Sequence, residues 1–137
     1  FLSRDLSRAT FIEWRDFMSF EDLDVWKKSA RLSADLYREF SSLKDYGFKD
    51  QITRAGLSIP SNISEGHERA SVRENMNFLN YAKGSCGELR TQIYIGMEIG
   101  YITKDKGKVW LKETESISAM VGGLIRSKKA IIKKNNK

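Results

Sequence analysis

The sequence is poor in the residues that build disulfides, metal sites and long loops. Its 137 residues include one cysteine, one proline and one histidine. The lone Cys86 excludes an intrachain disulfide framework, which favours a reducing compartment and predicts a cytoplasmic protein. His67 has no partner at metal-ligand spacing, so neither a metal nor another cofactor is expected. With one proline and ten glycines, the chain should be mostly regular structure.

Long apolar runs are also missing. All of them fall far short of the ~20 residues that cross a bilayer, so no membrane partner is expected. The opening residues FLSRDLSRATF lack the layout of a signal peptide, which argues against secretion. They also lack an initiator methionine, which is consistent with a start further upstream. No Gly-rich loop follows a strand, so no Walker or Rossmann nucleotide site and no small-molecule substrate is predicted.

What the chain does have is helical periodicity. Apolar residues recur every three or four positions along residues 20–130, and no strand-like alternation competes with them. We expect helices from residue 20 to 45, from 49 to 66, from 71 to 100 and from 103 onwards. Short connections between long helices predict one all-α domain, an antiparallel up-down four-helix bundle over residues 20–130. Residues 1–19 form an N-terminal extension and residues 131–137 a basic tail.

Several residues mark where these helices begin, bend and end. Ser71, three residues before a glutamate, fits a capping box, and Thr103 is a plausible cap for the last helix. Gly66 is expected to end the second helix in the left-handed conformation. Pro60 removes one backbone hydrogen bond inside that helix and predicts one kinked helix. The alternative is two shorter helices with Ser58 as the second cap.

The leading nineteen residues are too apolar for a disordered arm. We expect a short helix there, or a segment packed on a neighbour. The residues behind this expectation are Phe11, Ile12, Trp14, Phe17 and Met18.

Polar residues run beside the apolar stripe of the second helix and face similar residues on the third. The favoured interpretation is a buried hydrogen-bond network, or a subunit contact, that fixes register, with Arg54 paired to Glu65 or Glu88. The alternative is a cleft for binding or catalysis. Cys86, on an apolar seam, is predicted to be a buried inert thiol rather than a nucleophile. The members of the polar set are Arg54, Ser58, Asn62, Glu65, Arg69, Ser85 and Glu88.

Positive charge gathers at the C-terminal end. Residues 103–137 hold ten basic and three acidic residues, whereas the whole chain has a net charge of +6. Lysines at a helix C-terminus are favoured by the helix dipole, but those at its start are not. Solvation or a polyanionic partner accounts for the latter, and nucleic acid is the candidate ligand. The candidate residues are Lys104, Lys106, Lys108, Lys112, Arg126, Lys128, Lys129, Lys133 and Lys134.

Three stretches carry a family resemblance. They read FEDLDVWKKSARL, QITRAGLSIPSNISEGHER and FLNYAKGSCGELRTQI, and the tripeptide GYI follows them before the last helix. Together they cover roughly residues 20–126 and resemble the small four-helix-bundle proteins encoded in intervening sequences of bacterial 23S ribosomal RNA genes. The leading nineteen residues depart from the usual start of that family.

The resemblance implies a bundle that assembles into a ring, typically a homopentamer, with no established biochemical role. A more distant similarity to the accessory variability protein of retroelements implies a pentameric bundle that binds nucleic acid and a reverse transcriptase. The resemblance assigns no catalytic role to the family's characteristic polar positions. These positions correspond to Arg54, Ser58, Asn62, Glu65, Gly66, Arg69, Gly84, Ser85 and Glu88.

The sequence therefore leads to two main hypotheses. The first is a non-enzymatic, ring-forming bundle whose basic surface contacts RNA or DNA. The second is a protein–protein adaptor or scaffold without nucleic-acid binding, whose lysines serve solubility. An enzyme acting between the second and third helices is a weaker third alternative.

Overall fold

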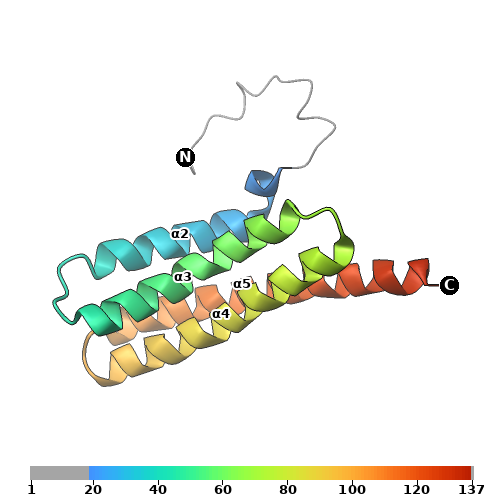
Figure 1. The fold of residues 1–137 in the computed structure, drawn as a ribbon. Helices are drawn as coiled ribbons and strands as arrows, with labels where there is room; N and C mark the ends of the chain where they lie inside the picture. The colour runs from blue at the N-terminus through green and yellow to red at the C-terminus, as the bar shows by residue number, and fades with distance from the viewer. Residues whose placement is uncertain (1–18, 137) are drawn as a thin grey trace.

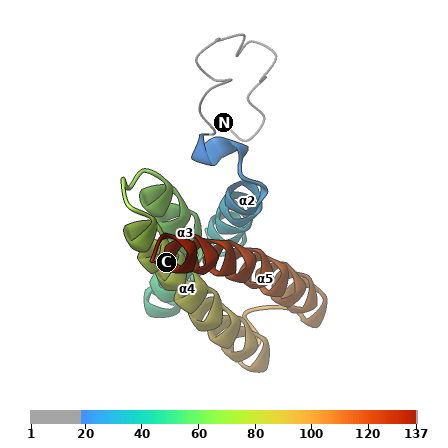
Figure 2. The ribbon, with the colours of Figure 1, turned by 90° about the vertical axis from the view of Figure 1, so that its right-hand side faces the viewer.

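The computed structural model describes residues 19–136, and within them the regular structure is entirely helical. A short 3-10 helix, η2 (Phe20–Asp22), precedes α2 (Asp24–Glu39), α3 (Tyr46–His67), α4 (Val72–Glu98) and α5 (Lys104–Asn135). Consecutive helices run antiparallel and pack side by side, and a contact between α2 and α5 closes the bundle (Figure 1). Viewed end-on, α2 and α4 lie across the bundle from each other (Figure 2). The predicted all-α four-helix bundle is confirmed.

The core is a single apolar cluster to which all four helices contribute. Leu36, Ile59, Ile93 and Ile117 have no exposed side-chain surface, and each comes from a different helix. The residues expected to pack at the N-terminus, between Phe11 and Met18, lie outside the described residues. No helix within residues 19–136 combines the length and apolar character that crossing a membrane requires.

The first helix is shorter than predicted. It ends at Glu39, and Asp45 then caps α3 by accepting a hydrogen bond from the Phe48 backbone N–H at 3.1 Å. Tyr46 therefore begins the second long helix, three residues before the predicted start at residue 49. Tyr37 on α2 is 46% exposed, because the buried stripe of that helix follows Leu32 and Leu36.

Gly66 is not a left-handed cap. It lies inside α3, and the only glycine with positive φ among the described residues is Gly100, at 84°. Gly100 ends α4 in a Schellman motif, in which the Tyr101 backbone N–H donates to the Gly96 carbonyl at 2.8 Å. Gly66 serves packing instead: an added Cβ would stand 2.8 Å from the Phe78 Cβ of α4.

Other boundary predictions are confirmed. α3 runs through Pro60 as one helix rather than two. The Ser71 hydroxyl accepts from the Glu74 N–H at 3.0 Å, and the Thr103 hydroxyl accepts from the Lys106 N–H at 3.2 Å.

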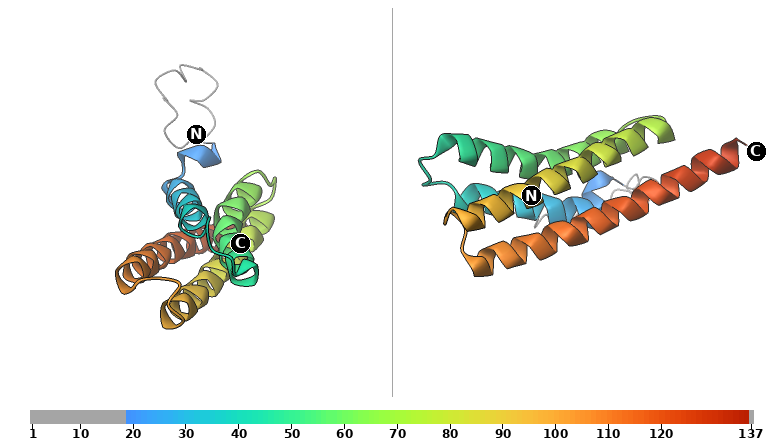
Figure 3. Two further views of the ribbon diagram at one scale, coloured as in Figure 1. Left: turned by 90° about the vertical axis from the view of Figure 1, so that its left-hand side faces the viewer. Right: turned by 90° about the horizontal axis from the view of Figure 1, so that it is seen from below.

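The last helix is much longer than the first. α5 has 32 residues and α2 has 16. It continues to Asn135, through most of the segment that was set apart as a basic tail. Its C-terminal turns project beyond the loop between α3 and α4 (Figures 1 and 3). Those turns carry their positive charges away from the body of the bundle.

The close contact at Gly66 makes a stability prediction. Gly66→Ala should lower the free energy of unfolding by about 1–3 kcal/mol, because the new Cβ would overlap Phe78 and the Asn75 carbonyl oxygen. Gly84→Ala is the control, since an added Cβ there meets nothing within 4 Å. It should raise the free energy of unfolding by about 0.5–1 kcal/mol. Urea unfolding followed by circular dichroism measures both, and shifts of the same sign would contradict the packing role of Gly66.

Candidate functional site

A short chain of hydrogen bonds joins α3 to α4. The Ser58 hydroxyl accepts from the Ser85 hydroxyl at 2.9 Å and from the Asn62 side-chain amide, also at 2.9 Å. The same amide donates to the Ser58 carbonyl at 2.8 Å. All three side chains are half-buried. The contact therefore satisfies polar groups that the helix interface removes from water.

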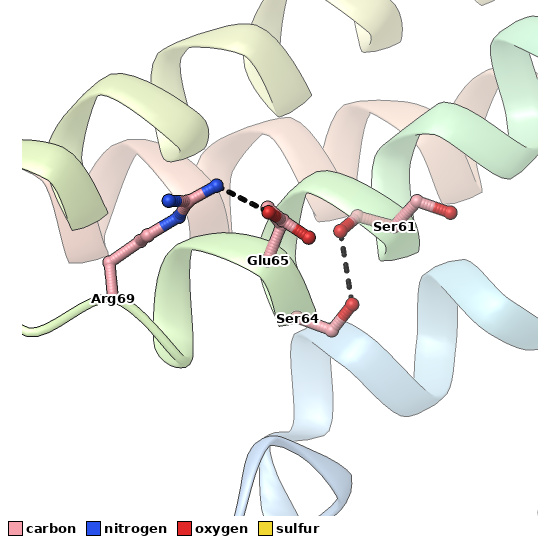
Figure 4. A network of polar contacts seen from close by, with 4 residues as sticks. All are labelled: Ser61, Ser64, Glu65 and Arg69. Carbon is pink, nitrogen blue, oxygen red and sulfur yellow. Dashed lines mark hydrogen bonds and ion pairs between the residues drawn. The ribbon is translucent and has the colours of Figure 1, made fainter.

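The ion pair expected between Arg54 and Glu65 or Glu88 is not formed within residues 19–136. Arg54 and Glu88 are exposed, and Glu88 instead accepts a 3.4 Å hydrogen bond from the Gln92 side chain. Glu65 pairs with Arg69, which follows the C-terminal end of α3 (Figure 4). Because Glu65 and Arg69 are four residues apart, their side chains are already neighbours, and this local pair forms in preference to a pair with Arg54.

The Arg69 guanidinium also covers part of the next helix. It lies 4.8 Å from the centroid of the Phe78 ring at the start of α4. The nearby Ser64 hydroxyl donates to the Ser61 carbonyl at 3.0 Å (Figure 4). This end of α3 is thus held by short-range contacts that involve no buried charge. Exposed pairs of this kind add at most about 1 kcal/mol each to stability.

The remaining reactive groups give little support to catalysis. Cys86 is 1% exposed, and burial raises its pKa to about 11, so the thiol stays protonated at neutral pH. His67 is the half-buried last residue of α3. Among residues 19–136, no three His, Cys, Asp or Glu side chains gather as a metal ion requires.

One polar contact ties two loops together at the end of the bundle. The Tyr101 hydroxyl donates to the Asp45 carboxylate at 2.8 Å, so the start of α3 is linked to the connection before α5. The hydrogen bond from the Phe48 N–H, followed by that from Tyr101, lowers the pKa of Asp45 below its ordinary value of 3.8. The same contact raises the pKa of Tyr101.

The basic residues of α5 form two rows on one side of that helix. Lys104, Lys108 and Lys112 recur at steps of four, and a second row follows with Arg126, Lys129 and Lys133. The rows begin 22 residues apart, close to six helical turns, so they share a face. The other three candidates occupy different faces, and the Lys106 ammonium lies 5.7 Å from the centroid of the Trp110 ring. These three residues are Lys106, Lys128 and Lys134.

Two residues of the second row, Lys129 and Lys133, border a groove to which α4 contributes. This open groove has a volume of about 560 Å³ and is bounded on the α4 side by Arg73 and Met76. On the opposite side it is lined by three residues of α5 and by the residue that caps this helix: Lys129, Ile132, Lys133 and Asn136. Arg73 was missed by sequence reasoning, which considered only the basic C-terminal segment. The predicted antiparallel packing of the last two helices was the available signal, because it brings Arg73, at the start of α4, beside the C-terminal end of α5.

Comparison with known proteins decides the family. A model of the family described as 23S rRNA-intervening sequence protein matches residues 21–123, which is most of the chain. The chain belongs to this family. A search of curated proteins found no match.

A similar fold occurs in a crystal structure from Bacteroides thetaiotaomicron VPI-5482. That protein is described as one of unknown function from the S23 ribosomal protein family. It is 24% identical, with a TM-score of 0.70, and the alignment covers 74% of this chain and 97% of that one. At this identity the likeness supports the fold alone.

The matched range divides the candidate residues of this 23S rRNA-intervening sequence protein. The hydrogen-bonded residues Ser58, Asn62 and Ser85 fall inside it, as does the first lysine row. Arg126 and the four candidate lysines after it lie beyond residue 123, where the match ends. The second basic row is therefore a feature of this chain outside the part that the family model matches.

The Asp45 contact predicts a pH dependence. Because the folded-state pKa of Asp45 is depressed, its contribution to stability is fully present above about pH 4 and is lost as the pH falls through the folded pKa. Asp45→Asn should melt at a lower temperature than wild type at neutral pH, and this difference should shrink under acid. Melting curves from neutral pH down to about pH 2.5 measure it.

Asp50→Asn serves as the control for this experiment. It neutralises another exposed carboxylate on α3 without removing a cap. A melting difference between Asp45→Asn and wild type that stayed constant with pH would contradict the assignment.

Proposed function

We propose that this protein is a non-enzymatic bundle that acts in the cytoplasm. Further copies of the chain assemble with it into a ring, and it contacts RNA or DNA through the basic surface of α5. The observation that carries the proposal is a set of cations that have no acidic partner. Three ion pairs occur within residues 19–136, and none of them uses any of the nine candidate residues.

The placement of acidic residues strengthens this argument. The three acidic residues of the C-terminal segment all precede residue 116, so the second basic row has none on its own helix after that point. A row of unneutralised cations holds a layer of counterions, and a nucleic acid carries its own. Binding releases these ions, which makes the association favourable and dependent on salt.

Ring assembly is supported by two separate apolar surfaces. One is a groove of about 410 Å³ between α2 and α3, bordered by Tyr37, Leu57 and Pro60. The other is a set of exposed side chains at the C-terminal end of α4, among them Ile95 and the cap residue Ile99. A closed ring requires two different patches that meet head to tail, and one chain offers both here. The family resemblance gives five copies as the expected number.

A protein–protein adaptor is the alternative function. The groove between α2 and α3 favours it, because apolar lining of this kind suits a partner helix or segment. In that case the cations of α5 would act only through solubility. A protein partner that binds equally well at low and moderate salt would favour the adaptor.

The nucleic-acid proposal predicts a steep salt dependence. A labelled RNA strand or DNA duplex titrated with the protein should bind at low salt and be released as salt rises. In a plot of the logarithm of the binding constant against the logarithm of the salt concentration, each contacted phosphate should contribute about −0.7 to the slope for a single strand and about −0.9 for a duplex. Fluorescence anisotropy across a salt series measures this slope. A protein that fails to bind either probe at low salt would contradict the proposal.

The ring proposal predicts the behaviour of two variants and their mixture. Leu57→Asp in the groove and Ile95→Asp on α4 should each lower the assembly mass, because each places a charge in one patch. Mixing the two should give dimers only, since a single intact pair of patches remains. Light scattering after nuclease treatment measures these masses. A wild-type protein that stays monomeric would contradict the proposal, and Gln51→Asp, on exposed α3 surface, is the charge control.

A further inference from the structure

Two cations from different helices lie over a pair of successive glycines on α5. A Cβ placed on Gly122 would lie 3.4 Å from the Lys83 ammonium of α4 and 3.5 Å from the Arg126 guanidinium of α5. Gly123 follows directly, so two successive residues of α5 lack a side chain here. The two charged groups therefore lie close to the same point above Gly122, whose own backbone is buried.

Nothing acidic accounts for this arrangement. Neither Lys83 nor Arg126 belongs to any of the three ion pairs within residues 19–136. The stretch 75–87 of α4 contains no Asp or Glu, and neither does α5 after Glu115. Like charges that share a space repel each other, and both side chains have long rotatable stems. An anion held between them turns this repulsion into attraction on both sides.

Along the contact between α4 and α5, further basic residues follow in one direction only. Two turns further along, with α4 and α5 antiparallel, Lys83 gives way to Met76 and Gly122 to Lys129. Both of these line the groove bounded by Arg73 and Lys133. In the opposite direction the corresponding positions are Arg90 and Glu115, where the contact again holds an acidic residue. From Gly122 to the free end of α5, the charged residues of that helix are thus all basic.

We propose that the space over Gly122 is a phosphate-binding notch for a nucleic-acid strand. Lys83 and Arg126 hold one phosphodiester between them, and the cations of the adjoining groove guide the next phosphates along the strand. Lys is a compact point charge and Arg a planar fork, a combination that suits phosphate oxygens approached from two sides. A side chain at position 122 would occupy the notch. This inference rests on the proposed nucleic-acid binding and assigns its anchor point.

The test is the double variant Lys83→Gln/Arg126→Gln in the intact protein. Binding of a short fluorescein-labelled RNA strand should weaken about tenfold, as the loss of one charge-assisted contact would cause. The log–log salt slope should become shallower by about 0.7. The matched control is Arg31→Gln/Lys44→Gln, which removes one Arg and one Lys from exposed sites elsewhere. The control should retain the wild-type slope and nearly the wild-type affinity.

The possible results distinguish failure of the notch from failure of the nucleic-acid proposal. If wild type binds neither probe at low salt, the nucleic-acid proposal itself fails. If wild type binds and both double variants lose affinity equally, the charge acts diffusely and the notch is wrong. Lys83→Arg/Arg126→Lys exchanges the two cations and should recover most of the affinity, whereas a loss equal to that of the Gln variant would contradict the charge-based notch. Circular dichroism melting confirms that each variant is folded.

Discussion

The close antiparallel contact between α3 and α4 positions the rest of this molecule. It depends on two small features: the missing side chain at Gly66 and the hydroxyl pair Ser58–Ser85. The Asn75 side-chain amide donates to the Gly66 carbonyl at 2.8 Å, and the same carbonyl accepts from the Arg69 backbone N–H at 3.1 Å, so the end of α3 is tied to the start of α4. These contacts fix the rotation of α4 about its own axis. That rotation in turn decides which α4 side chains face α5, and Lys83 and Arg73 are among them.

The local parts of this architecture could be predicted from sequence. Short-range signals in the sequence predicted the helices and two of their caps. These signals are the period of the apolar residues, the cap residues Ser71 and Thr103, and the scarcity of proline. Gly66 was misread because a glycine near a helix end has two possible uses, as a left-handed cap or as a close-contact point. Only the position of Phe78 on the facing helix distinguishes them. Arg54 and Glu88 were misread for a similar reason: helical spacing shows that two residues share a face, but not whether that face is buried.

The candidate site shows the same division. The abundance of lysine and arginine after residue 103 is visible in the sequence, and so is their spacing along one face of α5. The contributions of Lys83 and Arg73 are not visible, because α4 as a whole carries no excess of positive charge. Their importance comes from where the α4–α5 pairing puts them. A net charge computed by segment therefore finds the helix that supplies the cations and overlooks the helix that completes the groove.

The unequal lengths of α2 and α5 have a consequence for how strongly an assembly would bind. The free end of α5 extends past the neighbouring loop, so its cations stay accessible when the apolar sides of the bundle are covered (Figure 3). In the proposed ring these ends would repeat once per copy around the rim. A strand held at one copy would then be present at high effective concentration for the next. Weak binding at each copy would then give a high overall affinity through avidity, and no copy would need an additional contact.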